Sequence, residues 1–133
     1  MRVFLDTNVL ASGLATRGLC SDVVRTTLEL HELVVSERML GELDRILRTK
    51  FGVPEDAIAE VLRMLRQDSI VGEEHPILAV NILDTDDIPI LSAAHNAGAE
   101  YFVSGDSEVR GVISVGALKI VSPREFWESI RRG

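Results

Sequence analysis

The chain has 133 residues, of which 46% are hydrophobic and 26% charged, and its formal net charge is −7. This length and apolar content predict a single domain over residues 1–133 with a core of its own, and they argue against a disordered chain. An acidic protein does not attract nucleic acid through its overall charge. It would need a local basic patch or a bound metal ion to do so.

The single cysteine, Cys20, excludes an internal disulfide and suits a reducing compartment. No apolar run approaches the length needed to span a bilayer. The first residues also lack the layout of a signal peptide, because an apolar strand begins at once. We therefore expect a cytoplasmic protein with no membrane anchor.

Short apolar runs alternate with stretches of helical periodicity along the chain. Residues 9–14 are expected to form a loop, because they are mostly small and include Gly13. The alternation predicts an α/β fold of three layers, α/β/α, around a central parallel sheet. Strands are expected over 3–5, 33–35, 70–71, 101–103 and 119–121, and helices over 21–32, 36–50, 54–65, 88–97 and 122–131.

Four carboxylates are expected to converge at one end of this sheet. Asp6 directly follows the first strand and Asp106 follows the fourth, so both lie at the carboxyl edge, where α/β sheets bind ligands. Asp87 begins a helix on its inward side, and Glu42 lies beside the apolar stripe of its own helix. For Asp6 and Asp87 a second interpretation stays open, namely that each only caps the turn or helix that follows it.

Converging carboxylates repel one another strongly once water is thinned out, so protons or cations must occupy such a site. Carboxylate oxygens suit Mg²⁺ or Mn²⁺, whereas His31, His75 and His95 are scattered along the chain and offer no zinc site. Divalent ions held by carboxylates are typical of phosphate chemistry, in which an ion can help to deprotonate an attacking water.

At these residues the chain resembles the PIN-domain family over nearly its whole length. The resemblance implies a PIN-like fold and an Mg²⁺- or Mn²⁺-dependent endoribonuclease that hydrolyses RNA phosphodiester bonds. It further implies the toxin of a toxin–antitoxin pair, with an RNA substrate, an antitoxin protein as partner and, commonly, a homodimer. The stretches that resemble the family's motifs are Leu5–Leu10, Gly41–Leu47, Asp84–Ala94 and Val103–Asp106, and Ile120–Phe126 is similar to the tail of its toxin-like branch.

Carried over residue by residue, the resemblance assigns the catalytic and metal-holding roles to four acids. Asn8 and Ser104 would position those acids or a water molecule. Glu108 matches a further acidic slot, in which the family more often has an aspartate. The four acids are Asp6, Glu42, Asp87 and Asp106.

The third motif departs from the family pattern because Asp84, Asp86 and Asp87 crowd together where one or two acids are usual. We favour Asp87 as the residue that faces the metal, because of its spacing from the inward apolar residues of the helix, with Asp84 in a supporting role. Asp84 and Asp86 also fit ordinary solvated turn residues.

Two arginines follow Glu42 on the same helix, and Arg45 lies next to it on the helical wheel. Arg45 and Arg48 could meet an RNA phosphate, or they could belong to a solvated helix face. The apolar faces of the helices over 36–50 and 88–97 could likewise form a dimer contact or part of the core.

Three other functions compete with the nuclease. A non-catalytic PIN-like module that binds RNA or protein would keep the acidic site without turnover. A phosphoreceiver-like switch also gathers acids at a sheet edge, but it needs a lysine after a late strand, and Lys119 begins its strand instead. A haloacid-dehalogenase-like phosphatase would need a second aspartate two residues after Asp6, where this chain has Asn8.

Overall fold

The computed structural model describes residues 1–79, 85–106 and 114–132 of the chain. At its centre is a six-stranded sheet in the order β3-β2-β1-β4-β6-β5. Neighbouring strands run parallel except for the β5–β6 pair. The predicted α/β fold with a central parallel sheet is therefore confirmed. The strands are β1 (Arg2–Leu5), β2 (Glu32–Val35), β3 (Ile70–Val71), β4 (Tyr101–Val103), β5 (Ser114–Val115) and β6 (Leu118–Val121).

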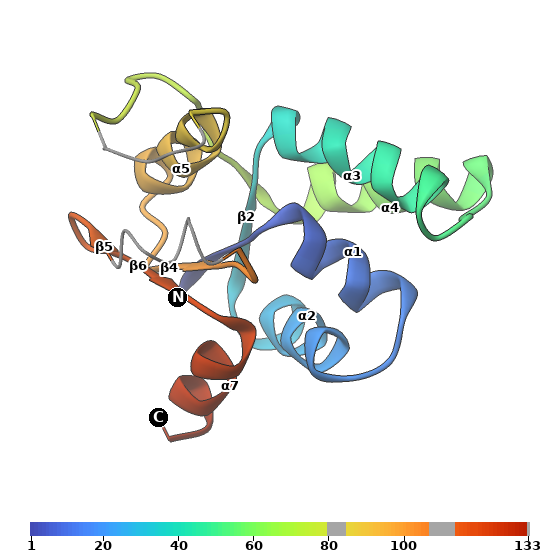
Figure 1. Ribbon diagram of the computed structural model, residues 1–133, viewed down its shortest axis with the longest axis horizontal. Helices are drawn as coiled ribbons and strands as arrows, with labels where there is room; N and C mark the ends of the chain where they lie inside the picture. The colour runs from blue at the N-terminus through green and yellow to red at the C-terminus, as the bar shows by residue number, and fades with distance from the viewer. Residues whose placement is uncertain (80–84, 107–113, 133) are drawn as a thin grey trace.

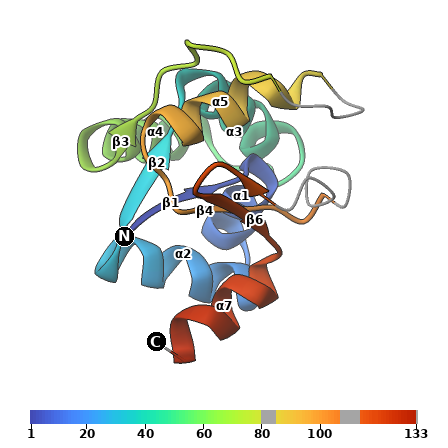
Figure 2. The same ribbon diagram turned by 90° about the vertical axis from the view of Figure 1, so that its left-hand side faces the viewer.

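Helices cover both faces of the sheet. Figure 2 shows α3, α4 and α5 on one side of the strands and α2 and α7 on the other. Helix α1 packs against both α2 and α3 (Figure 1), so it links the two helical layers. The helices described are α1 (Thr7–Ala15), α2 (Leu19–Leu30), α3 (Glu37–Thr49), α4 (Glu55–Asp68), α5 (Asp87–Asn96) and α7 (Pro123–Arg132).

The core is built on the central strands β1 and β4. Val3, Phe4 and Leu5 are fully buried, as expected for a strand that is covered on both faces. The rings of Phe4 and Phe102 stack across the two strands with their centroids 5.0 Å apart. The short apolar run that opens the chain is thus the middle of the sheet.

The expected loop over residues 9–14 was wrong, because these residues lie inside helix α1. The glycine that suggested a loop has a packing role instead. A Cβ atom on Gly13 would lie 2.3 Å from Cγ2 of Val24 and 2.6 Å from the carbonyl oxygen of Cys20, so only glycine lets α1 approach α2 this closely. The structure of this segment is therefore determined by its packing against neighbouring helices, and this outweighs its local composition.

Several helix ends follow the predicted caps. Ser36 caps α3, with its Oγ accepting a hydrogen bond from the backbone N–H of Met39 (3.2 Å). Ser122 and Glu125 form the predicted reciprocal capping box of α7. Pro54, in contrast, is the N-cap of α4 and not its first helical residue. The short antiparallel strand β5 was not predicted.

The apolar faces of α3 and α5, which from the sequence could have formed either a dimer contact or part of the core, are buried within this chain. Met39, Leu43 and Leu47 of α3 belong to its core, as do Ile90 and Leu91 of α5. These faces are therefore part of the fold. Among the described residues, no helix combines the length and the apolar character needed to cross a membrane.

The register of the parallel strands brings the chain's polar residues together at one edge. Leu5 lies opposite Val103, and Val103 lies opposite Val121. The residues that follow β1 and β4, Asp6 and Ser104, are therefore neighbours at the carboxyl edge of the sheet. The backbone N–H of Asp6 donates to the carbonyl of Val103 (2.9 Å), which extends the ladder by one step.

Candidate metal centre

A cavity of about 600 Å³ opens at the carboxyl edge of the sheet. Its walls come from the ends of β1 and β4, the first turn of α1, the middle of α3 and the start of α5. All five acids among its lining residues lie on the segments singled out from the sequence, and four of them are the predicted metal-holding acids. One arginine joins them. The lining residues are Asp6, Thr7, Asn8, Glu42, Arg45, Ile46, Asp86, Asp87, Gly105 and Asp106.

Asp6 is both a helix cap and a wall of the cavity. Its Oδ1 accepts a hydrogen bond from the backbone N–H of Thr7 (2.8 Å), and it is the N-cap of α1. Its Oδ2 accepts from the hydroxyl of Ser104 (2.9 Å). Asp6 therefore caps α1 and also lines the cavity, and each of its carboxylate oxygens accepts a hydrogen bond. Its metal-holding role stays a prediction.

Ser104 connects two of the acids. It is completely buried, and its Oγ donates to Asp6 while accepting from the backbone N–H of Asp106 (3.0 Å). One hydroxyl thus sets the position of the Asp6 carboxylate and of the turn that carries Asp106. The positioning of these acids for a reaction stays a prediction for Ser104.

Thr7 holds the acid on α3. Its side chain is 2% exposed, and its Oγ1 donates to Oε2 of Glu42 (3.1 Å). Asp6 and Glu42 are therefore linked through one residue, whose backbone N–H bonds the first acid and whose hydroxyl bonds the second. Sequence reasoning did not assign Thr7 a role. The sequence feature that could have indicated this role is a hydroxyl residue directly after an acid that caps a helix.

Burial raises the pKa of Asp6, and the negative charges of Glu42 and Asp106 raise it further. The hydrogen bonds from Ser104 and Thr7 act in the opposite direction, because they favour the charged form, but they do not cancel the effect. Asp6 is thus an acid that is costly to ionise in this fold unless a positive charge is close by.

The donor atoms of the cavity fit a hard divalent cation. Its acidic groups offer carboxylate oxygens, and no histidine or cysteine lines it in the described part of the chain. Among the described residues, no three His, Cys, Asp or Glu side chains are already arranged around a metal position. An ion that keeps several waters and takes only one or two carboxylates directly, as Mg²⁺ does, fits such a cavity better than one that needs four protein ligands.

The third acidic motif contributes more than one residue. Asp86 precedes α5, Asp87 is its first residue, and both line the cavity. From the sequence we favour Asp87 as the residue that faces the metal, with Asp84 in a supporting role, and treat Asp86 as a solvated turn residue. Asp84 lies outside the described residues, and so does Glu108 after the fourth motif.

The remaining predicted residues separate into two groups. Asn8 is exposed and lines the cavity, and Arg45 also lines it. Arg48 does not line it. Its guanidinium lies 2.9 Å from the carboxylate of Asp44 and 3.9 Å from that of Glu55, in a separate depression between α3 and α4. The structure therefore brings one of the two predicted phosphate-binding arginines to the cavity.

Fold and cavity together define a class, that of α/β domains whose acidic cavity opens at the carboxyl edge of a parallel sheet. Within this class the chain belongs to the PIN domain family, whose sequence model matches residues 2–108. No curated protein matches the chain at a significant level.

A solved structure shares the fold. It is the crystal structure of VapBC2 from Rickettsia felis bound to a DNA fragment from their promoter, and it matches with a TM-score of 0.60. The match covers 92% of this chain and 98% of that chain, at 13% sequence identity. The similarity at this identity concerns the fold, and the predicted PIN-like architecture is confirmed by it.

Proposed function

We propose that the chain is an Mg²⁺- or Mn²⁺-dependent endoribonuclease and the toxin component of a toxin–antitoxin pair. The observation that carries the proposal is that the carboxylates of Asp6, Glu42 and Asp106 lie close enough in one cavity to interact electrostatically. The charges of Glu42 and Asp106 raise the pKa of the partly buried Asp6, so this group of acids favours a bound cation. Asp87 would complete the set. The family match and the toxin–antitoxin complex among the similar folds support the assignment.

In this proposal the chain's own residues hold and orient the reacting groups. Thr7 and Ser104 fix the carboxylates of Asp6 and Glu42 through the hydrogen bonds described above. Arg45, on the wall of the cavity, offers its guanidinium to a phosphate of the RNA. A divalent ion bound between the acids would supply a more acidic water and neutralise charge on the scissile phosphate.

The acidic cavity and the family resemblance also bear on the partners of the chain. Because the cavity is acidic, it favours an RNA phosphate only after a cation has occupied it, which makes substrate binding depend on the metal. We further propose a small antitoxin protein that neutralises the toxin in the cytoplasm, and a homodimer as the active form.

The proposal is tested by incubating a labelled pool of structured RNA with the protein in Mg²⁺, Mn²⁺ or EDTA. The Asp6→Asn variant serves as the inactive form, and Asp44→Asn, on the same helix as Glu42 but outside the cavity, serves as the control. We expect discrete cleavage by the wild type and by the control, only with metal, and none by Asp6→Asn. Metal binding by the wild type without any cleavage would refute the nuclease and favour the non-catalytic binding module.

A further inference from the structure

Arg38 of α3 lies beside the cavity, although the sequence did not single it out. Arg38, Glu42 and Arg45 are spaced by four and three residues, so the three share one face of the helix. Glu42 and Arg45 both line the cavity, and Arg38 follows the same face one turn toward the start of α3. The charges of Glu42 and Asp86 also act on Arg38, which agrees with this placement.

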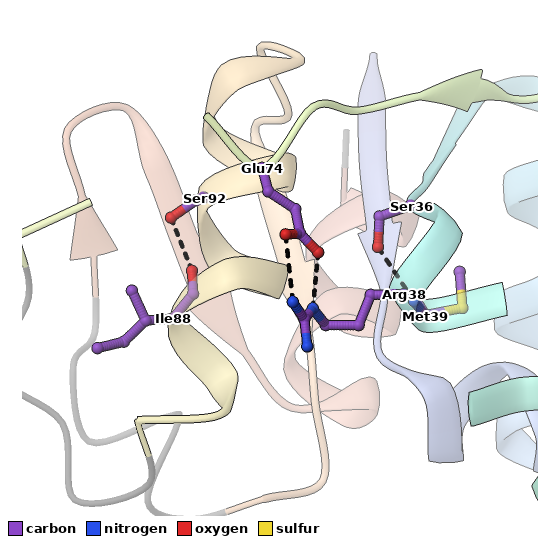
Figure 3. A network of polar contacts seen from close by, with 6 residues as sticks. All are labelled: Ser36, Arg38, Met39, Glu74, Ile88 and Ser92. Carbon is purple, nitrogen blue, oxygen red and sulfur yellow. Dashed lines mark hydrogen bonds and ion pairs between the residues drawn. The ribbon is translucent and has the colours of Figure 1, made fainter. Parts of the chain in front are cut away.

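The guanidinium of Arg38 is held along one edge. Its Nε donates to Oε1 of Glu74 (2.6 Å) and its Nη2 to Oε2 (3.3 Å), which is a two-pronged contact (Figure 3). A guanidinium carries five N–H groups, and Glu74 accepts from two of them. No other hydrogen bond to this side chain occurs in the part of the chain that the structure describes. With Arg38 48% exposed, its remaining N–H groups can meet a ligand from solvent.

Glu74 is itself anchored. It belongs to residues 73–78, a segment between β3 and α5 that we call the strap. Asn96 of α5 donates to the carbonyls of Glu73 (2.9 Å) and Pro76 (3.0 Å). The strap is also tied to α5 where the N–H of Leu78 donates to the hydroxyl of Ser92 (2.9 Å), which in turn donates to the carbonyl of Ile88 (Figure 3). Glu74 therefore holds the Arg38 guanidinium from a segment that is itself hydrogen-bonded to α5 on both sides of Glu74.

We propose that Arg38 binds an RNA phosphate next to the one met by Arg45, and that Glu74 orients the guanidinium for this contact. The inference rests on the proposed ribonuclease function and extends it to the path of the RNA strand, which would run along α3 from Arg45 toward Arg38. A fixed guanidinium loses less side-chain entropy on binding than a free one, and its planar fork matches a phosphate. Arg38 is a substrate-positioning residue in this scheme.

A second ion pair, between Glu37 of α3 and Arg66 of α4, supplies a matched control. Nε and Nη2 of Arg66 donate to the carboxylate of Glu37 (2.9 and 3.2 Å), also in a two-pronged contact. Arg66 is 49% exposed, which is close to the value for Arg38, but it borders the depression between α3 and α4. A variant at Arg66 thus removes the same charge and the same kind of ion pair away from the cavity.

The test is RNA binding, measured by fluorescence anisotropy with a labelled single-stranded RNA of mixed sequence over a series of KCl concentrations. Ca²⁺ replaces Mg²⁺ as a hard, oxygen-seeking cation, and the RNA is checked for integrity after each titration. We expect Arg38→Gln to bind about tenfold more weakly, with the slope of log affinity against log salt reduced by about 0.7, the value for one phosphate contact on a single strand. Arg66→Gln should bind like the wild type, and Arg38→Lys should keep the salt slope but lose affinity.

Each outcome decides one part of the proposal. Equal binding by Arg38→Gln and Arg66→Gln would overturn the phosphate contact at Arg38, while leaving the ribonuclease proposal intact. Wild-type affinity in Arg38→Lys would overturn the orienting role of Glu74, because a lysine keeps the charge without the fork. Absence of RNA binding by the wild type itself would overturn this inference together with the proposed function. Thermal unfolding of all variants checks that they fold.

Discussion

Replacing Asp6 by asparagine should separate the stability of the fold from its affinity for metal. The carboxamide keeps the shape of the side chain, accepts from the backbone N–H of Thr7 and donates to the hydroxyl of Ser104, so the cap is preserved. What disappears is a charge that the fold disfavours, because burial and the charges of Glu42 and Asp106 raise the pKa of Asp6.

The direction of the effect on stability follows from proton binding. Between the unfolded value of 3.8 and the raised pKa, folded Asp6 holds its proton while the unfolded chain has released it. The free energy of unfolding of the metal-free wild type therefore falls as pH rises through this range, by about 1.4 kcal/mol for each unit by which the pKa is raised. Asp6→Asn lacks this loss and should be at least as stable as the wild type in EDTA at neutral pH.

With added metal, the wild type should become more stable than Asp6→Asn. A cation at 100 times its dissociation constant stabilises the folded state by about 2.7 kcal/mol. With an unfolding entropy of about 2.1 cal/mol/K per residue, a chain of 133 residues would gain about 10 °C in melting temperature. Asp6→Asn should show little of this gain.

Thermal unfolding followed by circular dichroism measures both effects in EDTA and in Mn²⁺ or Mg²⁺. The wild type, Asp6→Asn and the control Asp44→Asn are compared at one pH. The reasoning is refuted if Asp6→Asn gains as much from metal as the wild type. It is equally refuted by a melting temperature of Asp6→Asn in EDTA that lies well below that of the wild type.

Three further substitutions test the hydrogen bond from Thr7 to Glu42 and the close packing of α1 on α2. Thr7→Val removes the hydroxyl that donates to Glu42. It should lower the free energy of unfolding by about 1 kcal/mol, measured in urea, and weaken Mn²⁺ binding about tenfold, measured by titration calorimetry. Unchanged Mn²⁺ affinity would argue against the positioning of Glu42 by Thr7. Gly13→Ala places a Cβ against Val24 and should destabilise the chain by about 1–3 kcal/mol in urea. Gly41→Ala on α3, where a Cβ meets open space, should instead stabilise it by about 0.5–1 kcal/mol, and equal effects of the two would contradict the close approach of α1 and α2.

The parts of the fold that depend on local sequence could be predicted. The apolar run at Val3–Leu5 became the central strand, and the Ser36 and Ser122 caps began their helices at the expected places. Helix α1 could not be predicted in the same way, because its glycine and small residues are stabilised by close contact with α2, which local propensity does not encode. Strand β5 consists of two residues at the edge of the sheet and pairs with its sequence neighbour β6. A run of two residues is too short to show a strand pattern in the sequence.

The same distinction applies to the site. Asp6 and Asp106 could be placed together because the carboxyl ends of neighbouring parallel strands share one edge. The ion pair that holds Arg38 beside the cavity could not be seen in the sequence, because its partner Glu74 lies 36 residues away on a segment without periodic structure. Arg45 and Arg48 are close in sequence, but only Arg45 faces the cavity, since the next turn of α3 directs Arg48 toward α4.

The central claim is that water hydrolyses an RNA phosphodiester bond at this acidic cavity. It is tested most directly by a single-turnover cleavage in ¹⁸O-labelled water, with Mg²⁺ or Mn²⁺, followed by mass spectrometry of the product ends. We predict one ¹⁸O atom in the terminal phosphate of the product, formed only with metal and only by protein that retains Asp6. An unlabelled 2′,3′-cyclic phosphate that forms equally in EDTA would contradict the claim, because it would mean that the RNA's own 2′-hydroxyl had attacked.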